Sequence, residues 1–331
     1  MYLRSLRCPA NPSSFESGAG FFNDFKDKCS TAKKGTSKKA CNFALQFARG
    51  EHVVVYDAED RPDPDQLRKA AAAFLAYPDV SCFQARLAID NAGESWLARI
   101  FALDYAIWFR TLLPGLDRLH APIPLGGTSN HFRTESLIAA GAWDPFNVTE
   151  DADLGIRLAR LGHRVSMLDS TTLEEAPSRF GPWYRQRTRW MKGYMQSLLV
   201  HTREPTKLVR KLGLGGCAVV NLFLGGAVWS ALVNPVLWVM FAISLLARAI
   251  DPSALDFLAR LSGLAVLAGN GLLAALSFAT EEPRQRLRCI PFALSYPLYW
   301  LLISGAAYRA LWQLCRDPFR WEKTPHGGAP L

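Results

Sequence analysis

Three carboxylates follow a short apolar run in the stretch VVVYDAED at residues 53–60. The β-branched run predicts a strand buried in an α/β sheet, which places Asp57, Glu59 and Asp60 at the carboxyl edge, where such sheets bind ligands. Alternating carboxylates there can hold a hard divalent cation, and the cation can neutralise a diphosphate. Taken alone, the stretch is explained more simply as a solvated acidic turn before a helix.

A second group of acids lies within residues 144–161, where Thr149 can cap a helix whose first turn contains Glu150, Asp151 and Asp153. The helix dipole stabilises negative charge at this end, so the acids do not by themselves require a catalytic explanation. A catalytic role for these acids would need support from elsewhere in the chain.

Aromatic residues and cations are interleaved in residues 181–201, which contain Trp183, Tyr184, Arg185, Arg187, Arg189, Trp190, Lys192 and Tyr194. This mixture is typical of a helix that lies in the membrane interface. An ordinary amphipathic helix docked on the preceding domain is the alternative. The apolar runs that follow in the chain favour the membrane.

The elements that must position these groups follow an α/β order. Apolar patterning predicts a strand at residues 80–89, another at 165–168 that ends near two glutamates, and helices at 67–75 and 96–113. The paired glycines of LGGTS, at residues 125–129, permit close approach of backbone to a ligand, although a plain turn explains them equally well.

The composition divides the 331-residue chain into two parts, because its apolar residues crowd after residue 212. The net charge of +9 lies largely in a lysine run at 33–39 and beside the apolar runs, and the latter placement is typical of a cytoplasmic membrane surface. We expect no nucleic-acid partner, because no nucleic-acid-binding motif accompanies the charge. The seven cysteines show neither a C-x-x-C pair nor zinc spacing, and the N-terminus shows no signal peptide.

Three uncharged runs cover residues 212–247, 261–280 and 289–308. The first would be about 54 Å long as a helix against a hydrocarbon core of roughly 30 Å, so it contains at least one span, with Asn234-Pro235 as a candidate kink. The third is rich in aromatics and suits either a span or an interfacial helix. Basic residues flank the first two runs and follow the third, which favours two spans plus an interfacial helix.

The order of the motifs resembles that of membrane-embedded family 2 glycosyltransferases, the group that includes bacterial cellulose, hyaluronan and related β-polysaccharide synthases. KKACNFAL at 38–45 resembles their nucleotide-contacting segment, YDAED their D-x-D motif, and TED at 149–151 and QRTRW at 186–190 match further signatures. PFRWEKTPHG at 318–327 resembles their gating segment. Each triplet alone is weakly specific, whereas the whole series in this order is strongly specific.

The resemblance implies a role for each matched residue. Asp151 would be the base, with Glu150 and Thr149 beside it; Asp57 and Glu59 would bind Mg²⁺ or Mn²⁺, although Asp60 is a second candidate for the position of Glu59. The remaining implied contacts are with the nucleotide (Lys39, Asn42, Asp57, Glu59, Asp60), the acceptor and channel (Gln186, Arg187, Arg189, Trp190) and the gate (Phe319, Trp321, Lys323, Thr324).

The resemblance also implies an α/β GT-A type glycosyltransferase domain with a mixed, mostly parallel sheet, followed by a helical membrane domain. We expect an unassigned segment at 1–32, the catalytic domain at 33–180, an interfacial helix at 181–211, membrane helices at 212–280, and a further interfacial helix with the gate at 281–331. The first 32 residues lack the strands with which family members begin, so the chain is expected to be truncated at its front.

The implied activity is inverting, metal-dependent transfer from a UDP-sugar to a growing polysaccharide. The enzyme would lie at the cytoplasmic face of the cell inner membrane as a multi-pass protein, with further subunits of a synthase complex as candidate partners. Two alternatives remain: transfer of a single sugar to a lipid acceptor, and an inactive homologue that acts as a membrane scaffold.

Overall fold

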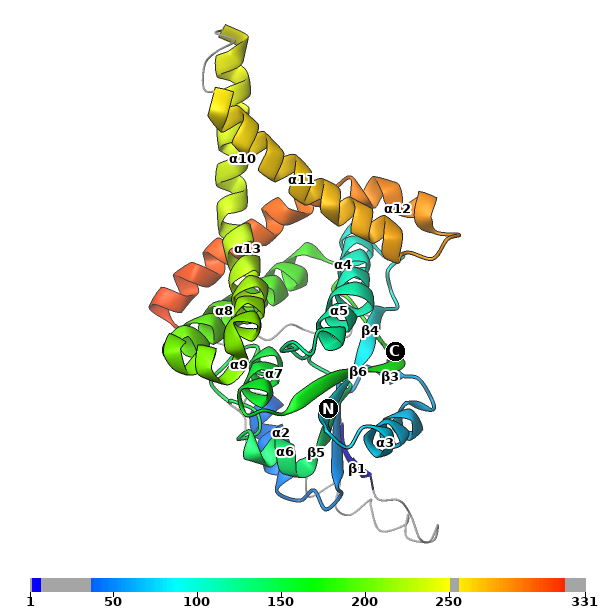
Figure 1. The fold of residues 1–331 in the computed structure, drawn as a ribbon. Helices are drawn as coiled ribbons and strands as arrows, with labels where there is room; N and C mark the ends of the chain where they lie inside the picture. The colour runs from blue at the N-terminus through cyan, green and yellow to red at the C-terminus, as the bar shows by residue number, and fades with distance from the viewer. Residues whose placement is uncertain (1, 7–36, 251–255, 319–331) are drawn as a thin grey trace.

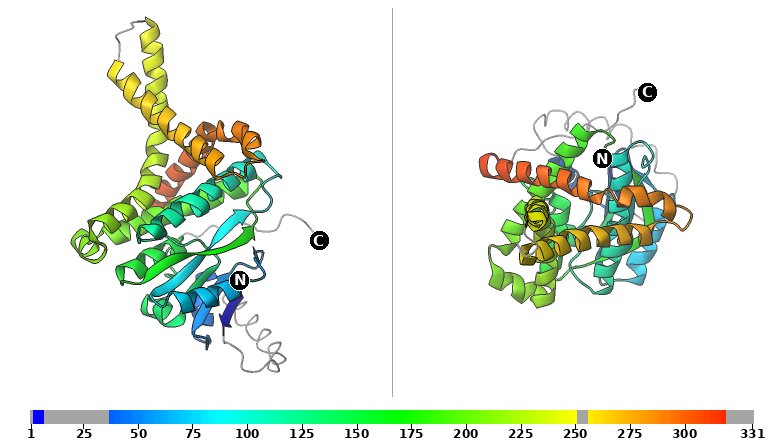
Figure 2. Two further views of the ribbon diagram at one scale, coloured as in Figure 1. Left: turned by 45° about the vertical axis from the view of Figure 1, so that its right-hand side comes forward. Right: turned by 90° about the horizontal axis from the view of Figure 1, so that it is seen from above.

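The computed structural model describes residues 2–6, 37–250 and 256–318. One sheet with flanking helices forms the base of the molecule, and two long helices project from it (Figure 1). The helices between these two parts lie across the foot of the projection (Figure 2).

The described strands form one sheet in the order β1-β2-β5-β4-β6-β3. Their bounds are β1 Tyr2–Leu6, β2 His52–Tyr56, β3 Arg61–Pro62, β4 Val80–Ile89, β5 Asn130–Arg133 and β6 Arg164–Glu174. The predicted strands at 53–56, 80–89 and 165–168 are present, and the last continues to Glu174. Residues Val53, Val54 and Val55 of β2 are all buried, as a strand inside an α/β sheet requires.

The expectation of a mostly parallel sheet is wrong. Only β4 and β6 pair in parallel among the described strands, while β1–β2, β2–β5, β4–β5 and β3–β6 are antiparallel. Strands β2, β4 and β6 do run in one direction, but β5 is inserted in reverse between β2 and β4. Its sequence, NHFR, is short and largely polar, so it shows no apolar pattern from which the strand could be predicted.

Helices cover the sheet and carry the acidic motifs to its edge. They are α2 Ser37–Leu45, α3 Gln66–Ala76, α4 Trp96–Ile107, α5 Leu113–Arg118, α6 Thr134–Ala139 and α7 Glu150–Arg160, and a π-helical segment, Trp108–Leu112, joins α4 to α5. One buried cluster packs α7 and the loop before it against the strands, through Leu154 and Leu158 of α7, Trp143, and Val53 and Phe132 of the sheet. The position of α7 is therefore fixed by the sheet.

From Phe180 to Arg316 the described chain consists of helices joined by short turns. Its helices are α8 Phe180–Thr202, α9 Pro205–Val220, α10 Gly226–Ile250, α11 Asp256–Thr280, α12 Arg286–Ala293 and α13 Tyr296–Arg316, with a π-helical segment, Asn221–Gly225, between α9 and α10. Gly213 has a non-helical backbone with φ of 69° and breaks α9, whereas α10 continues through Pro235.

Among the described residues, two helical stretches are long and apolar enough to cross a membrane, Pro205–Ala249 and Phe257–Thr280. The pair α12 and α13 would add a third if it formed one span, but it is bent by 52° between the two helices. Viewed down α10, α13 runs across the foot of the projecting helices (Figure 2). This arrangement agrees with two spans and an interfacial helix, which stays a prediction.

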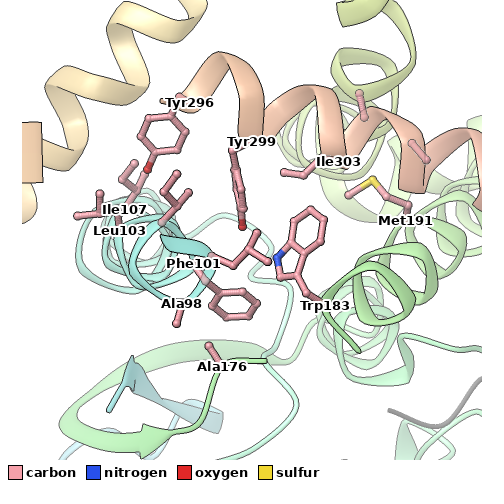
Figure 3. Close-up of a cluster of buried hydrophobic side chains, with 14 of the residues drawn as sticks. Ala98, Phe101, Leu103, Ile107, Ala176, Trp183, Met191, Tyr296, Tyr299 and Ile303 are labelled. Carbon is pink, nitrogen blue, oxygen red and sulfur yellow. The ribbon is translucent and has the colours of Figure 1, made fainter. Parts of the chain in front are cut away.

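An aromatic core joins the sheet domain to the C-terminal helices (Figure 3). Phe101 of α4, Trp183 of α8 and Tyr296 and Tyr299 of α13 are all buried in one cluster. The ring centroids of Trp183 and Tyr299 lie 5.4 Å apart. Because α4, α8 and α13 share this core, we expect them to move as one unit with the sheet domain.

Candidate active site

The acids of DAED differ in exposure. Asp57 and Glu59 are exposed just beyond the end of β2, whereas Asp60 is half-buried. The hydroxyl of Thr128 donates a hydrogen bond to the Asp60 carboxylate, and the backbone N–H of Asp57 donates to the same hydroxyl group at 3.2 Å. Asp60 therefore holds the turn together, while the other two carboxylates face outward. This division favours Glu59 over Asp60 as the partner of Asp57 in metal binding.

Negative charge is concentrated at this edge. Burial raises the pKa of Asp60 to about 6, the charges of Asp57 and Glu59 act in the same direction, and the hydrogen bond from Thr128 opposes them. The register of β3 and β6 brings Glu174 to the same end of the sheet. Burial raises the pKa of Glu174 well above its ordinary value, chiefly by desolvation and next by the charge of Asp60.

The glycine-rich loop at 125–129 joins the two acidic motifs. The side-chain amide of Gln84 fixes it from β4, accepting from the N–H of Gly126 at 2.7 Å and donating to the carbonyl of Thr128 at 3.0 Å. A Cβ on Gly127 would lie 3.7 Å from Oδ2 of Asp151. This loop thus contacts Asp60 through Thr128 and faces Asp151 through Gly127. The motifs DAED and TED, which are distant in the sequence, therefore meet at this loop.

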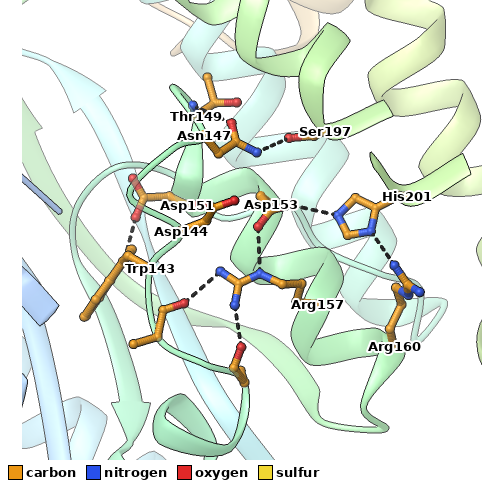
Figure 4. A network of polar contacts seen from close by, with 12 residues as sticks. Trp143, Asp144, Asn147, Thr149, Asp151, Asp153, Arg157, Arg160, Ser197 and His201 are labelled. Carbon is orange, nitrogen blue, oxygen red and sulfur yellow. Dashed lines mark hydrogen bonds and ion pairs between the residues drawn. The ribbon is translucent and has the colours of Figure 1, made fainter. Parts of the chain in front are cut away.

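Asp151 is buried in the first turn of α7, with 7% of its surface exposed. The indole N–H of Trp143 donates a hydrogen bond to its Oδ1 at 3.0 Å (Figure 4). Trp143 is held in turn by Asn42, which donates to its carbonyl at 2.7 Å and accepts from its N–H at 3.1 Å. In this structure Asn42 positions the tryptophan that orients Asp151, so its contribution to nucleotide binding stays a prediction.

Thr149 does not cap α7 as predicted. It occupies the N-cap position, but its side chain makes no capping hydrogen bond, and its backbone N–H donates to the Asn147 side chain at 3.0 Å. The reason is steric: α8 passes so close that a Cβ on Gly193 would lie 2.6 Å from Cβ of Thr149. The threonine side chain therefore packs against the helix backbone of α8.

A set of polar contacts ties the TED loop to α8 (Figure 4). The side-chain amide of Asn147 donates to Ser197 at 2.9 Å, and Gln196 accepts from the N–H of Val148 at 3.3 Å. One turn further along each helix, His201 and Asp153 make a buried contact of 2.9 Å. These bonds fix the start of α7 against α8.

The residues of QRTRW, which lie on α8, occupy different surroundings. Gln186 and Arg187 are buried, and Trp190 is half-buried against the ring of Tyr105. The guanidinium of Arg187 lies 4.4 Å from the Phe101 ring centroid and 4.7 Å from that of Trp190, and it pairs with Asp104 at 3.3 Å. Arg187 therefore belongs to the aromatic core. It does not belong to the acidic edge, the end of the sheet where Asp57, Glu59, Asp60 and Glu174 gather.

Arg189 belongs to the other face of α8. Burial lowers its pKa, and the negative charge of Asp57 opposes this shift, so its guanidinium interacts with the acidic edge. A fixed positive charge beside Asp57 suits a site that receives a diphosphate. Of the two motif arginines, Arg189 is the one whose charge interacts with Asp57.

The donor set fits a hard divalent cation. Asp57 and Glu59 offer carboxylate oxygens where crowding of like charges disfavours a full set of ionised acids, and a cation would relieve that crowding. Within the described ranges, no three His, Cys, Asp or Glu side chains form a metal-binding group. One or two carboxylates completed by substrate phosphates is the usual manner of binding Mg²⁺.

Several site residues escaped the sequence analysis, and several predicted ones are not described. Trp143 and Tyr105, which donates a hydrogen bond to Glu174, have no motif signal of their own, whereas Thr128 belongs to LGGTS, which is recognised by its glycines and not by its hydroxyl. The predicted gate residues Phe319, Trp321, Lys323 and Thr324, and the side chain of Lys39, lie outside the part of the chain that the structure describes.

The fold is similar to that of a solved mannosyltransferase from Pyrobaculum calidifontis in complex with GDP-Man and Mn²⁺. The TM-score is 0.51 and the sequence identity 21%, covering 85% of this chain and 67% of that one. This likeness concerns the fold, and it confirms the predicted GT-A type domain.

The chain is also similar to curated glycosyltransferases. It is 30% identical over 169 residues to a probable glucomannan 4-beta-mannosyltransferase of Arabidopsis thaliana, which is 51% of this chain and 30% of that protein. It is 24% identical over 212 residues to the probable glycosyltransferase YdaM of Bacillus subtilis, which is 61% of this chain and 50% of that protein. The chain thus spans half or less of the length of these relatives.

The family model described as glycosyl transferase family group 2 matches residues 52–311, which include both acidic motifs and QRTRW. Because the match extends over more than half of the chain, the protein belongs to glycosyl transferase family group 2.

Proposed function

We propose that the chain transfers a hexose from a nucleoside-diphosphate sugar to an acceptor hydroxyl, with inversion at the anomeric carbon, and that Asp151 is the general base. The observation that carries this proposal is the meeting of the two acidic motifs at one loop, where Thr128 bonds to Asp60 and Gly127 faces Asp151. A base and a diphosphate-binding edge on opposite sides of one loop are what a direct displacement needs.

The orientation of Asp151 supports its role as the base. Its Oδ1 accepts the Trp143 indole N–H, while Oδ2 is directed toward the glycine loop. In the proposed reaction, Asp151 takes the proton of the acceptor hydroxyl as its oxygen bonds to the anomeric carbon. The bond from that carbon to the diphosphate oxygen breaks, and the nucleoside diphosphate leaves.

Asp57 and Glu59 would hold Mg²⁺ or Mn²⁺, which when bound would neutralise the charge of the leaving diphosphate. Arg189 adds positive charge on the same side, through its interaction with Asp57. Trp190 would offer an aromatic face to the acceptor sugar beside Tyr105. The chain's own residues thus supply a base, an acceptor surface and a diphosphate contact.

The donor that we propose is a UDP-sugar, and the acceptor a growing polysaccharide. GDP-mannose is the competing donor, because relatives are named mannosyltransferases and the solved neighbour holds GDP-Man. We place the reaction at the cytoplasmic face of the inner membrane. Support for this location comes from the two candidate spans and from Arg203, Lys207, Arg210, Lys211, Arg284, Arg286 and Arg288, which flank them on the side of the sheet domain.

The test is nucleotide release by the full chain purified in nanodiscs. UDP-sugars and GDP-mannose are supplied one at a time with Mn²⁺, beside Asp151→Asn and a matched control, Glu135→Gln. Glu135 is also an acid in the first turn of a helix, but it lies on α6 and is exposed. We expect one donor to release nucleotide, a loss of about 10²–10⁴-fold in the Asp151 variant, and no change in the control.

The outcomes separate the alternatives. A ladder of labelled products supports a polysaccharide acceptor, whereas a single labelled lipid supports transfer to lipid. A folded sample that binds no nucleotide in the presence of metal would overturn the proposal in favour of an inactive scaffold. Full activity in Asp151→Asn would overturn the assignment of the base.

A further inference from the structure

A groove of about 430 Å³ lies between the N-terminal end of α4 and α12, and none of the carboxylates of the acidic edge lines it. Two arginines and two aromatic side chains line it, together with smaller polar groups: Ser95, Trp96, Arg99, Gln285, Arg288 and Phe292. The proposed transfer reaction uses none of these residues. A cavity that combines cations with aromatic walls suits an anionic group attached to an apolar body.

The groove lies at the level where the apolar helices meet the sheet domain. Helix α11 returns from the projection toward that domain, and α12 lies at its lower end beside α4 (Figure 1). On α12, Leu287 is 77% exposed, and Leu294, just beyond its last residue, is 71% exposed. Leucines that face outward on a short helix beside two candidate spans are typical of a helix lying in the membrane interface.

Positive charge accumulates at the same level. Arg284, Arg286 and Arg288 lie within five residues of the turn between α11 and α12. Arg99 is largely enclosed and pairs with Glu281 at 3.2 Å, so part of its charge is already compensated. Arg288 is exposed and lines the groove. It is therefore the cation best placed to receive an anion from the membrane surface.

Trp96 and Phe292 form the apolar side of the groove. The indole N–H of Trp96 donates to Ser295 at 2.9 Å, which fixes the ring beside the start of α13. Both rings pack against the buried cluster that joins α4, α12 and α13. Tryptophan is enriched at the level of lipid head groups because its ring is amphipathic.

We propose that this groove binds the phosphate head group of an anionic phospholipid, with Arg288 as the principal contact and Arg99 as the second. The acyl chains would extend along the exposed leucines of α12. Basic pockets beside membrane helices on the cytoplasmic side recognise anionic head groups in this way. The inference does not depend on the proposed sugar transfer, because its test measures lipid binding alone.

The experiment titrates the delipidated full chain, in neutral detergent, with phosphatidylglycerol, phosphatidylcholine, glycerol phosphate and inorganic phosphate. Native mass spectrometry counts the bound molecules. We expect saturable binding of phosphatidylglycerol that weakens by about tenfold in Arg288→Gln, the loss of roughly one charge-assisted contact. Arg284→Gln is the matched control. Arg284 is an exposed arginine in the turn just before α12, and it does not line the groove.

An equal loss of phosphatidylglycerol affinity in Arg288→Gln and Arg284→Gln would overturn the proposed site and indicate a diffuse basic surface. Phosphatidylcholine that binds as tightly as phosphatidylglycerol would overturn the anionic preference, and equally tight free phosphate would assign the groove to a soluble ligand. If Arg288→Gln does not fold, Arg288→Lys keeps the test open: it retains the charge without the planar fork, and we expect intermediate affinity.

Discussion

Arg187 and Arg189 are two residues apart in one motif, yet they belong to opposite sides of the molecule. Arg187 is enclosed by the rings of Phe101 and Trp190 and is paired with Asp104. Arg189 is half-buried in a different environment, where its charge interacts with Asp57 at the acidic edge. Residues two apart on a helix do not share a face. Helix α8 therefore contacts the aromatic core on one side and the acidic edge on the other.

The two regions differ in whether each charged group has a partner of opposite charge. In the aromatic core, the cation has its counterion and ring partners, and burial raises the pKa of Asp104 while Arg187 opposes the shift. At the acidic edge, Asp57, Glu59 and Asp60 lie together; burial is the main cause of the raised pKa of Asp60, and the charges of Asp57 and Glu59 add to it. Compensated charge indicates a structural role, whereas accumulated like charge indicates that a ligand supplies the balance.

The largest effect that we expect is the loss of stability on removal of Arg187. Arg187→Gln leaves Asp104 without its cation and removes the contacts with four aromatic rings. Breaking a buried pair in this way costs about 3–5 kcal/mol. Thermal unfolding in nanodiscs would measure it. The double variant Arg187→Gln with Asp104→Asn should recover part of the loss, and a single variant as stable as the parent would contradict the structural role.

Arg189 should show the opposite behaviour. Arg189→Gln removes a charge that we place beside the diphosphate, so nucleotide release should fall by about 10²-fold while the melting temperature stays close to that of the parent. Arg189→Lys keeps the charge and should retain more activity. If the Arg189 variants unfold and the Arg187 variants lose only activity, the assignment of the two faces is reversed.

A smaller effect is expected where α8 meets the TED loop. Gly193→Ala places a methyl group 2.6 Å from Cβ of Thr149, so the loop or the helix must shift. Overpacking of this kind costs about 1–3 kcal/mol, and displacement of Asp151 should lower kcat more than it changes the KM for the donor.

Gly181→Ala is the control for this prediction. Gly181 lies on the same helix, but a Cβ there would meet only the end of the Arg185 side chain, at 3.7 Å, so the change should be tolerated. Equal kinetics in Gly193→Ala and the parent would show that the close approach of α8 does not position the base.

The sequence predicted the acidic edge better than it predicted the sheet around it. The strand before DAED, the strand at 80–89 and the helix after TED follow from local apolar patterns, and the structure contains them. Strand β5 does not follow, because its place between β2 and β4 depends on pairing with strands distant in the sequence. Tertiary pairing overrides local propensity in such short strands.

The same limit applies to the site. TED and DAED are recognisable as motifs, but the residues that join them act through tertiary contacts. Trp143 orients Asp151 only because Asn42, from a distant helix, holds its backbone. Thr149 has the residue type of a helix cap, yet the approach of Gly193 determines what its side chain contacts. Neither contact can be predicted from the spacing of residues in the sequence.

The smallest expected effect concerns His131, an enclosed group that should influence stability without influencing catalysis. It lies buried on β5, where desolvation lowers its pKa to about 3, and its Nε2 is 3.3 Å from Oε1 of Gln66. As the pH falls below 6.5, the unfolded chain gains a proton that the folded chain does not, so stability decreases. Between pH 6.5 and 5 the loss is about 1.5 kcal/mol.

His131→Gln removes this titration, so the free energy of unfolding of the variant should depend less steeply on pH over that range. This holds even if the substitution lowers the stability at every pH. Unfolding at pH 6.5 and at pH 5, for the parent and the variant, measures the difference in slope. Identical slopes would mean that His131 titrates normally and is not enclosed. A change in the pH profile of nucleotide release would instead connect His131 to the chemistry, and would break the division between compensated structural charge and the acidic edge.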